Sequence, residues 1–155
     1  MGTNHMGRQS IRFPQPPVVR GFASVAGKKE REGPLGDQFT ATVQDTTFGE
    51  KSWERAERRM QQMTLELALE KAGLTDADLD AAFAGDLLNQ CIGSSFSLRN
   101  RGVPTLGLYG ACSTMAESLL LAAMSVSGGF ARTALAMTSS HFASSERQYR
   151  FPLGY

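Results

Sequence analysis

A cysteine at the start of a predicted helix is the residue with the clearest chemical potential. Residues 109–114 (Tyr-Gly-Ala-Cys-Ser-Thr) join an apolar stretch to a helical pattern. This position sets the Cys112 sulfur beside the unpaired N–H groups of a helix N-terminus, which favour a thiolate and can hold an anion or an oxyanion. The turn is the cysteine counterpart of a nucleophile elbow. A buried, inert cysteine fits the pattern equally well, because free cysteine is among the most buried residue types.

Other polar side chains follow two predicted strands at the points where these strands end. In open α/β sheets, ligands bind outside the carboxyl ends of the strands. We therefore expect one group of candidate ligand-binding residues at that edge, although a lone histidine is more often a loop hydrogen-bonder. The group consists of Asp86, Asn89, Cys112, Ser139, Ser140 and His141.

Composition excludes several other classes of protein. Sixteen Lys and Arg against fifteen Asp and Glu give a net charge of +1. The chain therefore lacks the excess of positive charge that is typical of proteins that bind nucleic acid or anionic lipid. Two cysteines and two histidines are too few for a disulfide framework or a metal cluster, so no metal site and no cofactor are expected. Cys91 follows Gln90 in a loop and is interpreted as an inert packing residue. No glycine-rich segment has the spacing of a phosphate loop or a dinucleotide fingerprint.

The first part of the chain carries weak structural signals. Residues 1–10 have no periodicity and are interpreted as a disordered leader or an artificial remnant. Residues 18–25 are partly β-branched and predict a strand. Residues 28–47 combine a charge run with Gly-Pro-Leu-Gly and predict a surface loop without a clear element. The folded part is expected to be residues 11–155.

A helix follows with clear start and stop signals. Ser52 is a predicted N-cap and Gly73 a predicted stop. Residues 56, 60, 63 and 67 (Ala, Met, Met, Leu) fall at helical spacing and predict the apolar face that packs on the core. Residues 75–78 (Thr-Asp-Ala-Asp) resemble a capping box that opens one helical turn.

Strands and helices alternate in the remainder of the chain. Residues 81–85 and 105–109 predict buried strands, residues 133–138 predict a further strand, and residues 94–101 and 113–127 predict helices. This alternation predicts an α/β fold with a mostly parallel sheet covered by helices. Residues 147–155 close no predicted element, and a four-stranded sheet with helices on one side would leave apolar surface bare. We therefore expect this chain to be the first half of a longer protein.

Several segments resemble one protein family. The turn at Cys112 looks like the nucleophile turn of the thiolase and ketoacyl-synthase superfamily, and the wider set closely resembles the stage V sporulation protein AD family over residues 7–155. The matching segments are residues 33–36 (Gly-Pro-Leu-Gly), 85–90 (Gly-Asp-Leu-Leu-Asn-Gln), 110–114 with Glu117 and Ser118, 128–131 (Gly-Gly-Phe-Ala), 138–141 (Thr-Ser-Ser-His) and 146–152 (Glu-Arg-Gln-Tyr-Arg-Phe-Pro).

The resemblance implies a fold and a function. It implies the N-terminal half of a thiolase-like fold, in a sporulation protein that binds dipicolinic acid without catalysis and aids its uptake into the developing spore. The ligand is expected either free or as its calcium chelate, at Cys112, His141, Asn89, Ser139 and Ser140. Implied partners are membrane proteins of the same operon and a second copy of the chain, at the cytoplasmic face of the spore inner membrane and without a transmembrane segment.

Two other functions stay open at this point. A thiolase-like acyltransferase would form a thioester on Cys112, with the second half of the protein supplying acid and base. A structural module would use the same turn only for dimer packing. The second-half histidine and cysteine that complete a thiolase site do not occur in this chain.

Overall fold

The core of the protein is a three-stranded parallel sheet. A computed structural model describes residues 4–150, and its main sheet has the order β6-β5-β7. β5 (Ala81–Gly85) lies in the centre, with β6 (Thr105–Leu108) and β7 (Ala134–Thr138) parallel on either side. The predicted α/β class and the three predicted strands are confirmed. Because all three strands are parallel, their carboxyl ends meet at one edge.

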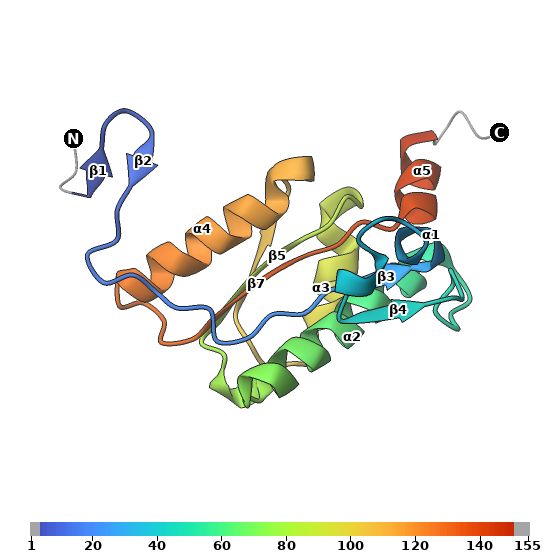
Figure 1. Cartoon of the computed structure of the whole chain (residues 1–155), viewed down its shortest axis with the longest axis horizontal. Coiled ribbons are helices and arrows are strands. Elements are labelled where there is room, and N and C mark those ends of the chain that lie inside the picture. The colour runs from blue at the N-terminus through green and yellow to red at the C-terminus, as the bar shows by residue number, and fades with distance from the viewer. Residues whose placement is uncertain (1–3, 151–155) are drawn as a thin grey trace.

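Helices cover both faces of this sheet (Figure 1). α4 (Thr114–Ser127) packs on β5 and β7, while α2 (Trp53–Ala72) and α3 (Ile92–Leu98) lie on the opposite side. Successive side chains of β5 point to opposite faces of the sheet, and both sets are apolar, so each face needs a covering layer of helices. One core cluster gathers side chains of α2, β5, α3, β7 and the connections that precede β5 and β6: Leu65, Leu69, Leu79, Ala82, Ala84, Leu98, Val103 and Met137.

This layering corrects the expectation of four strands with helices on one side. Apolar surface is nevertheless bare, because the outer side of α4 exposes large side chains that nothing in residues 4–150 covers: Met115, Leu119, Leu120 and Met124. β6 is also more exposed than predicted. Residues 105–107 are exposed rather than buried, because β6 is an outer strand of the sheet.

The long helix α2 has the predicted ends but a different buried face. The Ser52 hydroxyl accepts a hydrogen bond from the Arg55 N–H at 3.3 Å, and Gly73 closes the helix in the left-handed conformation at φ 65°. Of the predicted apolar face, Ala56 is buried as predicted, whereas residues 60, 63 and 67 are only half-buried, so the prediction for these three was wrong. The residues that α2 buries are Ala56, Glu57, Gln61, Leu65 and Leu69.

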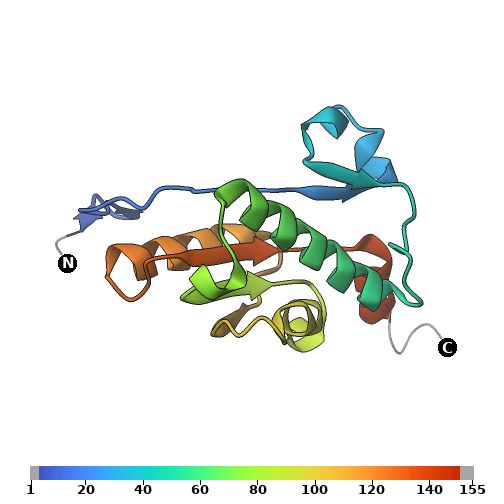
Figure 2. The same ribbon diagram turned by 90° about the horizontal axis from the view of Figure 1, so that it is seen from below.

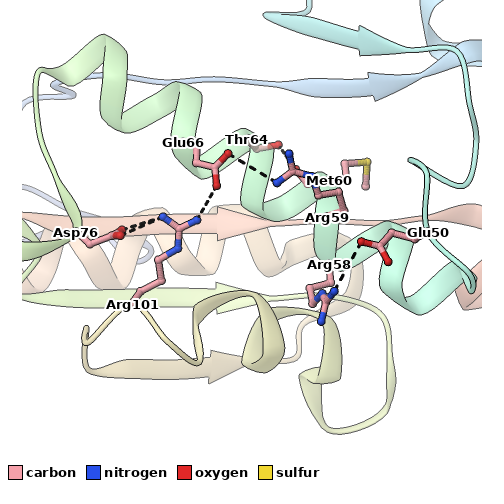
Figure 3. Close-up of polar contacts among 8 residues, drawn as sticks. All are labelled: Glu50, Arg58, Arg59, Met60, Thr64, Glu66, Asp76 and Arg101. Carbon is pink, nitrogen blue, oxygen red and sulfur yellow. Dashed lines mark hydrogen bonds and ion pairs between the residues drawn. The ribbon is translucent and has the colours of Figure 1, made fainter.

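Ion pairs join the outer side of α2 to neighbouring turns (Figure 3). Arg101 lies between Glu66, at 3.0 Å, and Asp76, at 3.1 Å. Asp76 begins η2 (Asp76–Asp78), where the predicted capping box of Thr75 is confirmed. These pairs are partly exposed, so each contributes about 0–1 kcal/mol.

The N-terminal part differs most from the predictions. Residues 18–24 form no strand; they run extended alongside α2 (Figure 2). At Gly21 the chain comes so close to the C-terminal part of α2 that a Cβ would lie 2.8 Å from the Ala68 carbonyl oxygen. The predicted loop at residues 28–47 contains three elements: α1 (Lys28–Arg31), η1 (Gly36–Gln38) and β4 (Ala41–Val43). β4 pairs in parallel with β3 (Val25–Gly27).

Two further segments complete the description. Within the predicted leader, β1 (His5–Met6) and β2 (Ser10–Ile11) pair antiparallel, apart from the sheet (Figure 1). At the other end, where no element was predicted, α5 (Phe142–Arg150) follows β7. Within residues 4–150, no helix is both long and apolar enough to cross a bilayer.

Candidate functional site

The turn after β5 is organised by a buried carboxylate. Asp86 is 1% exposed; Oδ1 accepts the Leu88 N–H at 2.8 Å, and Oδ2 accepts the Ser94 N–H at 2.7 Å and its hydroxyl at 2.6 Å. Both oxygens are therefore occupied by the protein itself. Asp86 fixes the start of α3 rather than offering a free carboxylate at the edge of the sheet.

The same turn contains two residues in a strained conformation. In η3 (Asn89–Cys91), Gln90 has φ 59° and Cys91 has φ 50°, in the left-handed region that side chains with a Cβ rarely adopt. Cys91 is buried and its sulfur lies 3.2 Å from the Leu108 carbonyl oxygen, so its predicted packing role is confirmed. Strain of this kind persists only where the surrounding structure holds it, and it is frequent at ligand sites.

A pocket of about 340 Å³ opens beside this turn. It lies at the carboxyl edge of the sheet, between the turn after β5, the end of β6 and α5. None of its lining residues is Asp, Glu, Lys, Arg or His. They provide amide, apolar, thiol and phenol groups: Leu87, Asn89, Gln90, Cys91, Tyr109, Gln148 and Tyr149. A second hollow of about 310 Å³ adjoins it, sharing Asn89 and Gln148 and adding Glu54 and Arg147.

Hydrogen bonds connect the two sides of the pocket. The Asn89 N–H donates to Gln148 Oε1 at 2.6 Å, which joins the β5 turn to α5. A hydrogen bond with Tyr149, together with partial burial, raises the pKa of Tyr109 above its ordinary value of 10.0. Tyr109 keeps its hydroxyl proton at neutral pH, and this hydroxyl donates to the Leu87 carbonyl oxygen at 3.4 Å.

Cys112 occupies the predicted turn but lines neither hollow. It lies in η4 (Ala111–Ser113) between β6 and α4, and the turn needs φ 50° at Ala111. Cys112 is exposed, so the interpretation as a buried packing residue is wrong. The Glu117 carboxylate accepts the Ser113 hydroxyl at 2.5 Å and lies against Gly110. A negative charge therefore already lies in the first turn of α4.

His141 lies on the far side of the sheet edge from Cys112. Its Nε2 is 2.8 Å from the Thr46 carbonyl oxygen, which only accepts, so Nε2 carries a proton. Its ring centroid lies 5.5 Å from that of Trp53. β5 separates the two outer strands, so the residues after β6 and after β7 lie about 10 Å apart at the spacing of sheet strands. No hydrogen bond joins Cys112 to His141 within the described residues.

A buried chain of hydrogen bonds runs behind the pocket, from Glu57 to Asp86. Glu57 is fully buried; Oε1 accepts the Ser139 hydroxyl at 2.7 Å and Oε2 the Ser144 hydroxyl at 2.5 Å. Gln61 Nε2 donates to Ser139 at 2.7 Å and to Ser94 at 3.1 Å, and Ser94 in turn donates to Asp86. The chain links α2 to the turn after β5, to α3, to the end of β7 and to α5.

Burial controls the protonation of Glu57. Desolvation raises the pKa of Glu57 above its ordinary value of 4.5, and the nearby Asp86 carboxylate adds to this effect. The hydroxyls of Ser144 and Ser139, and His141, oppose it. The described residues hold no group of three or more His, Cys, Asp or Glu side chains arranged to bind a metal ion.

The structure thus separates the predicted site residues. Asn89 lines both hollows, Ser139 belongs to the buried chain, Ser140 is exposed, and His141 and Cys112 lie on either side. Sequence reasoning missed Glu57, Gln61, Tyr109 and the residues of α5. The spacing of Glu57 and Gln61, one helical turn apart and next to apolar positions, was the available signal for a buried polar pair.

The fold defines the chain as a mixed α/β protein whose parallel sheet is flanked by helices, as in half of a thiolase-like domain. A sequence model of stage V sporulation protein AD matches residues 7–155, and the chain belongs to that family. It is 44% identical over 149 residues to stage V sporulation protein AD of Bacillus subtilis (strain 168). This match covers 96% of the chain but 44% of the relative, so the chain spans less than half of the relative's length. The family fits a role in sporulation.

Proposed function

We propose that the full-length protein binds dipicolinate without catalysis and aids its uptake into the developing spore. The observation that supports this most directly is the uncharged pocket of about 340 Å³ at the carboxyl edge of the sheet, in a chain of this sporulation family. Its volume falls within the range of small-molecule sites. Its lining combines aromatic rings with a few amide and phenol groups, which suits a flat ligand with polar ends.

The charge of the pocket favours the calcium chelate of dipicolinate over the free dianion. None of its seven lining residues carries a charge at neutral pH. Transfer of an uncompensated dianion from water to such a site is costly, whereas a chelate with one calcium ion has no net charge. Arg147, in the adjoining hollow, is already paired with Glu54 at 2.9 Å.

The partners and location follow from the same proposal. We place the protein at the cytoplasmic face of the spore inner membrane, held there by membrane proteins of the same operon, and as a homodimer. The exposed outer strand β6 and the bare side of α4 offer surface for such contacts. Contiguous exposed apolar side chains are typical of interaction sites.

An acyltransferase is the second candidate, supported by the position of Cys112. The thiol is exposed on a strained turn immediately before α4, which is where a nucleophile would lie. His141 is directed to Thr46, and so no base is in contact with the thiol among the described residues.

Calorimetric titration of the full-length protein with dipicolinate, with and without calcium, tests the proposal. We expect saturable binding, tighter with calcium, and a loss of about fivefold in Asn89→Ala, because one hydrogen bond is worth about 1 kcal/mol. Asn100→Ala is the matched control, since Asn100 is exposed and outside both hollows.

Cys112→Ala tests whether dipicolinate binds in the pocket or at the turn that carries Cys112. Unchanged affinity supports the pocket as the binding site, whereas a loss of about fivefold supports the predicted contact with the sulfur. Acetyl-CoA is the control ligand. Absence of heat with dipicolinate, together with thioester formation on Cys112 from acetyl-CoA, would overturn the binding proposal in favour of the acyltransferase.

A further inference from the structure

One wall of the pocket is formed by the short helix α5. α5 supplies Gln148 and Tyr149 to the larger hollow and Arg147 and Gln148 to the smaller one. If α5 moved away from α2, both hollows would lose these residues and the Asn89 backbone would lose its acceptor. What holds α5 against the body of the protein therefore decides whether the pocket exists.

Ser144 and Arg147 of α5 both bond to side chains of α2, and the two contacts differ in burial. Near the C-terminal end of α5, Arg147 pairs with Glu54 at 2.9 Å, but the Arg147 side chain is 66% exposed. At its beginning, the Ser144 hydroxyl donates to Glu57 Oε2 at 2.5 Å, and both residues are fully buried. Exposed ion pairs contribute little, whereas a buried hydroxyl bonded to a carboxylate makes a short, strong hydrogen bond.

Glu57 also holds the segment that leads into α5. Its second oxygen accepts the Ser139 hydroxyl at 2.7 Å, directly after β7. Between these two serines, His141 is anchored to Thr46, and the Ser144 hydroxyl also lies 2.9 Å from the His141 carbonyl oxygen. One carboxylate on α2 thus fixes both ends of the connection from β7 to α5.

We propose that Glu57 is the positioning residue of the candidate pocket: by accepting Ser139 and Ser144 it docks α5 on α2 and so sets the wall that carries Gln148 and Tyr149. Glu57 itself lines neither hollow, so it acts through α5 rather than through contact with a ligand. The part of this inference that concerns ligand affinity rests on the proposed function, whereas the docking of α5 does not.

The geometry also predicts which substitution preserves the docking. In Glu57→Gln, the side-chain oxygen can still accept from Ser139, while the new amide donates to the Ser144 oxygen. Ser144 then directs its own proton to the His141 carbonyl oxygen, 2.9 Å away. No heavy atom has to move. Glu57→Ala, by contrast, removes the acceptor of the Ser139 hydroxyl, breaks the link from Ser144 to α2 and leaves a cavity beneath α5.

Hydrogen–deuterium exchange of the full-length protein, without ligand, tests the docking directly. In Glu57→Ala we expect the amides of residues 142–149 to exchange at least about tenfold faster than in wild type, because α5 opens locally more often. Glu57→Gln should restore wild-type exchange. If Glu57→Ala is too unstable to study, Ser144→Ala removes only the bond on the α5 side and should loosen the same peptide.

Two further variants serve as controls. Glu70→Ala makes the same change on the exposed side of α2 and should leave exchange in α5 unchanged. Glu54→Ala removes only the exposed ion pair to Arg147 and should have a small effect. The proposal is overturned if Glu54→Ala loosens α5 as much as Glu57→Ala does, or if neither Glu57→Ala nor Ser144→Ala loosens it.

Calorimetric titration with calcium and dipicolinate then tests the link to the pocket. Glu57→Ala or Ser144→Ala should bind about tenfold more weakly than wild type, with Glu57→Gln within about twofold, in the same order as their exchange. If wild type itself binds no dipicolinate, the proposed function fails while the exchange results still decide the docking. Loosened α5 with unchanged affinity in these variants would show that α5 does not shape the binding site.

Discussion

The Gln61 amide nitrogen lies 2.7 Å from the Ser139 hydroxyl, although 78 residues separate them in the chain. The same nitrogen also donates to Ser94, 3.1 Å away on α3. Gln61 therefore joins three elements at the centre of the buried chain of hydrogen bonds. Its oxygen accepts the Ser97 hydroxyl at 2.7 Å, so both ends of the amide are in use.

Gln61→Leu is expected to destabilise the protein by about 1–3 kcal/mol, because buried hydroxyls of α3 and β7 lose their partner. Chemical denaturation of the full-length protein measures this change. Gln62→Leu, the adjacent and half-buried glutamine, is the matched control and should change stability by about 0.5 kcal/mol or less. Equal effects of the two substitutions would contradict a specific role of the Gln61 amide.

The pH dependence of stability should identify the buried carboxylate. Since burial raises the pKa of Glu57, the folded state binds its proton more tightly than the unfolded state does. The stability that Glu57 contributes is thus fully present below its ordinary pKa of 4.5 and is lost as pH rises through the raised folded value. The Gln side chain of Glu57→Gln does not titrate. As pH rises over that interval, the free energy of unfolding of Glu57→Gln should therefore increase relative to that of wild type.

Measuring the difference between these two proteins removes the contribution of other acids. The pKa values of Asp45, Asp78 and Asp80 lie below the ordinary value of 3.8, and hydrogen bonds from backbone N–H groups are the largest cause. These groups stabilise the fold above that pH and lose this effect on acidification, but they do so equally in both proteins. A difference that stays constant from about pH 4 to pH 8 would contradict the prediction for Glu57.

The two cysteines should differ sharply in reactivity toward iodoacetamide. Cys112 is exposed, whereas Cys91 is buried and its pKa is raised by that burial. We expect native protein to be labelled at Cys112, and at Cys91 only after unfolding, because the thiolate is the reactive form and needs access. Peptide mass spectrometry assigns the labelled site. Comparable labelling of both thiols in native protein would mean that the turn after β5 opens readily.

The proposed dimer makes β6 the strand to alter. Both β6 and β7 are outer strands, but only β6 has exposed residues, among them Leu106, which is 49% exposed. An uncovered strand edge invites pairing with a second chain. Leu106→Lys should shift the full-length protein from dimer to monomer in sedimentation at micromolar concentration. Leu35→Lys changes a leucine that is 65% exposed outside the sheet and should leave the dimer intact.

The sequence predicted the elements better than the contacts between them. Ser52 and Gly73 gave the ends of α2 correctly, because capping depends on local chemistry. Hydrophobic spacing then selected Met60 and Met63 for the core, whereas the structure buries Glu57 and Gln61. A buried polar side chain depends on partners far away in the chain, which periodicity in one helix does not contain.

The candidate site shows the same division. The parallel order of the strands and the turn at Cys112 followed from the pattern of apolar stretches, small residues and helical spacing. The pocket could not be predicted from this pattern. It needs α5, where the sequence predicted no element, and it combines Tyr109 and Gln148 from segments 39 residues apart. The strand order places β5 between Cys112 and His141, and strand order is not encoded locally.

The two buried polar residues of α2 also decide how this helix can rotate about its own axis. Glu57 and Gln61 lie one turn apart and both bond to Ser139. Glu57 also bonds to α5 through Ser144, and Gln61 to α3 through Ser94. Turning α2 by one residue position, about 100°, would bring Arg58 and Gln62 inward. The serine hydroxyls that bond to Glu57 and Gln61 would then lose these partners. An apolar stripe of leucines and alanines would tolerate several such orientations at similar energy. We therefore expect Glu57 and Gln61 to select one orientation of α2 among its competitors.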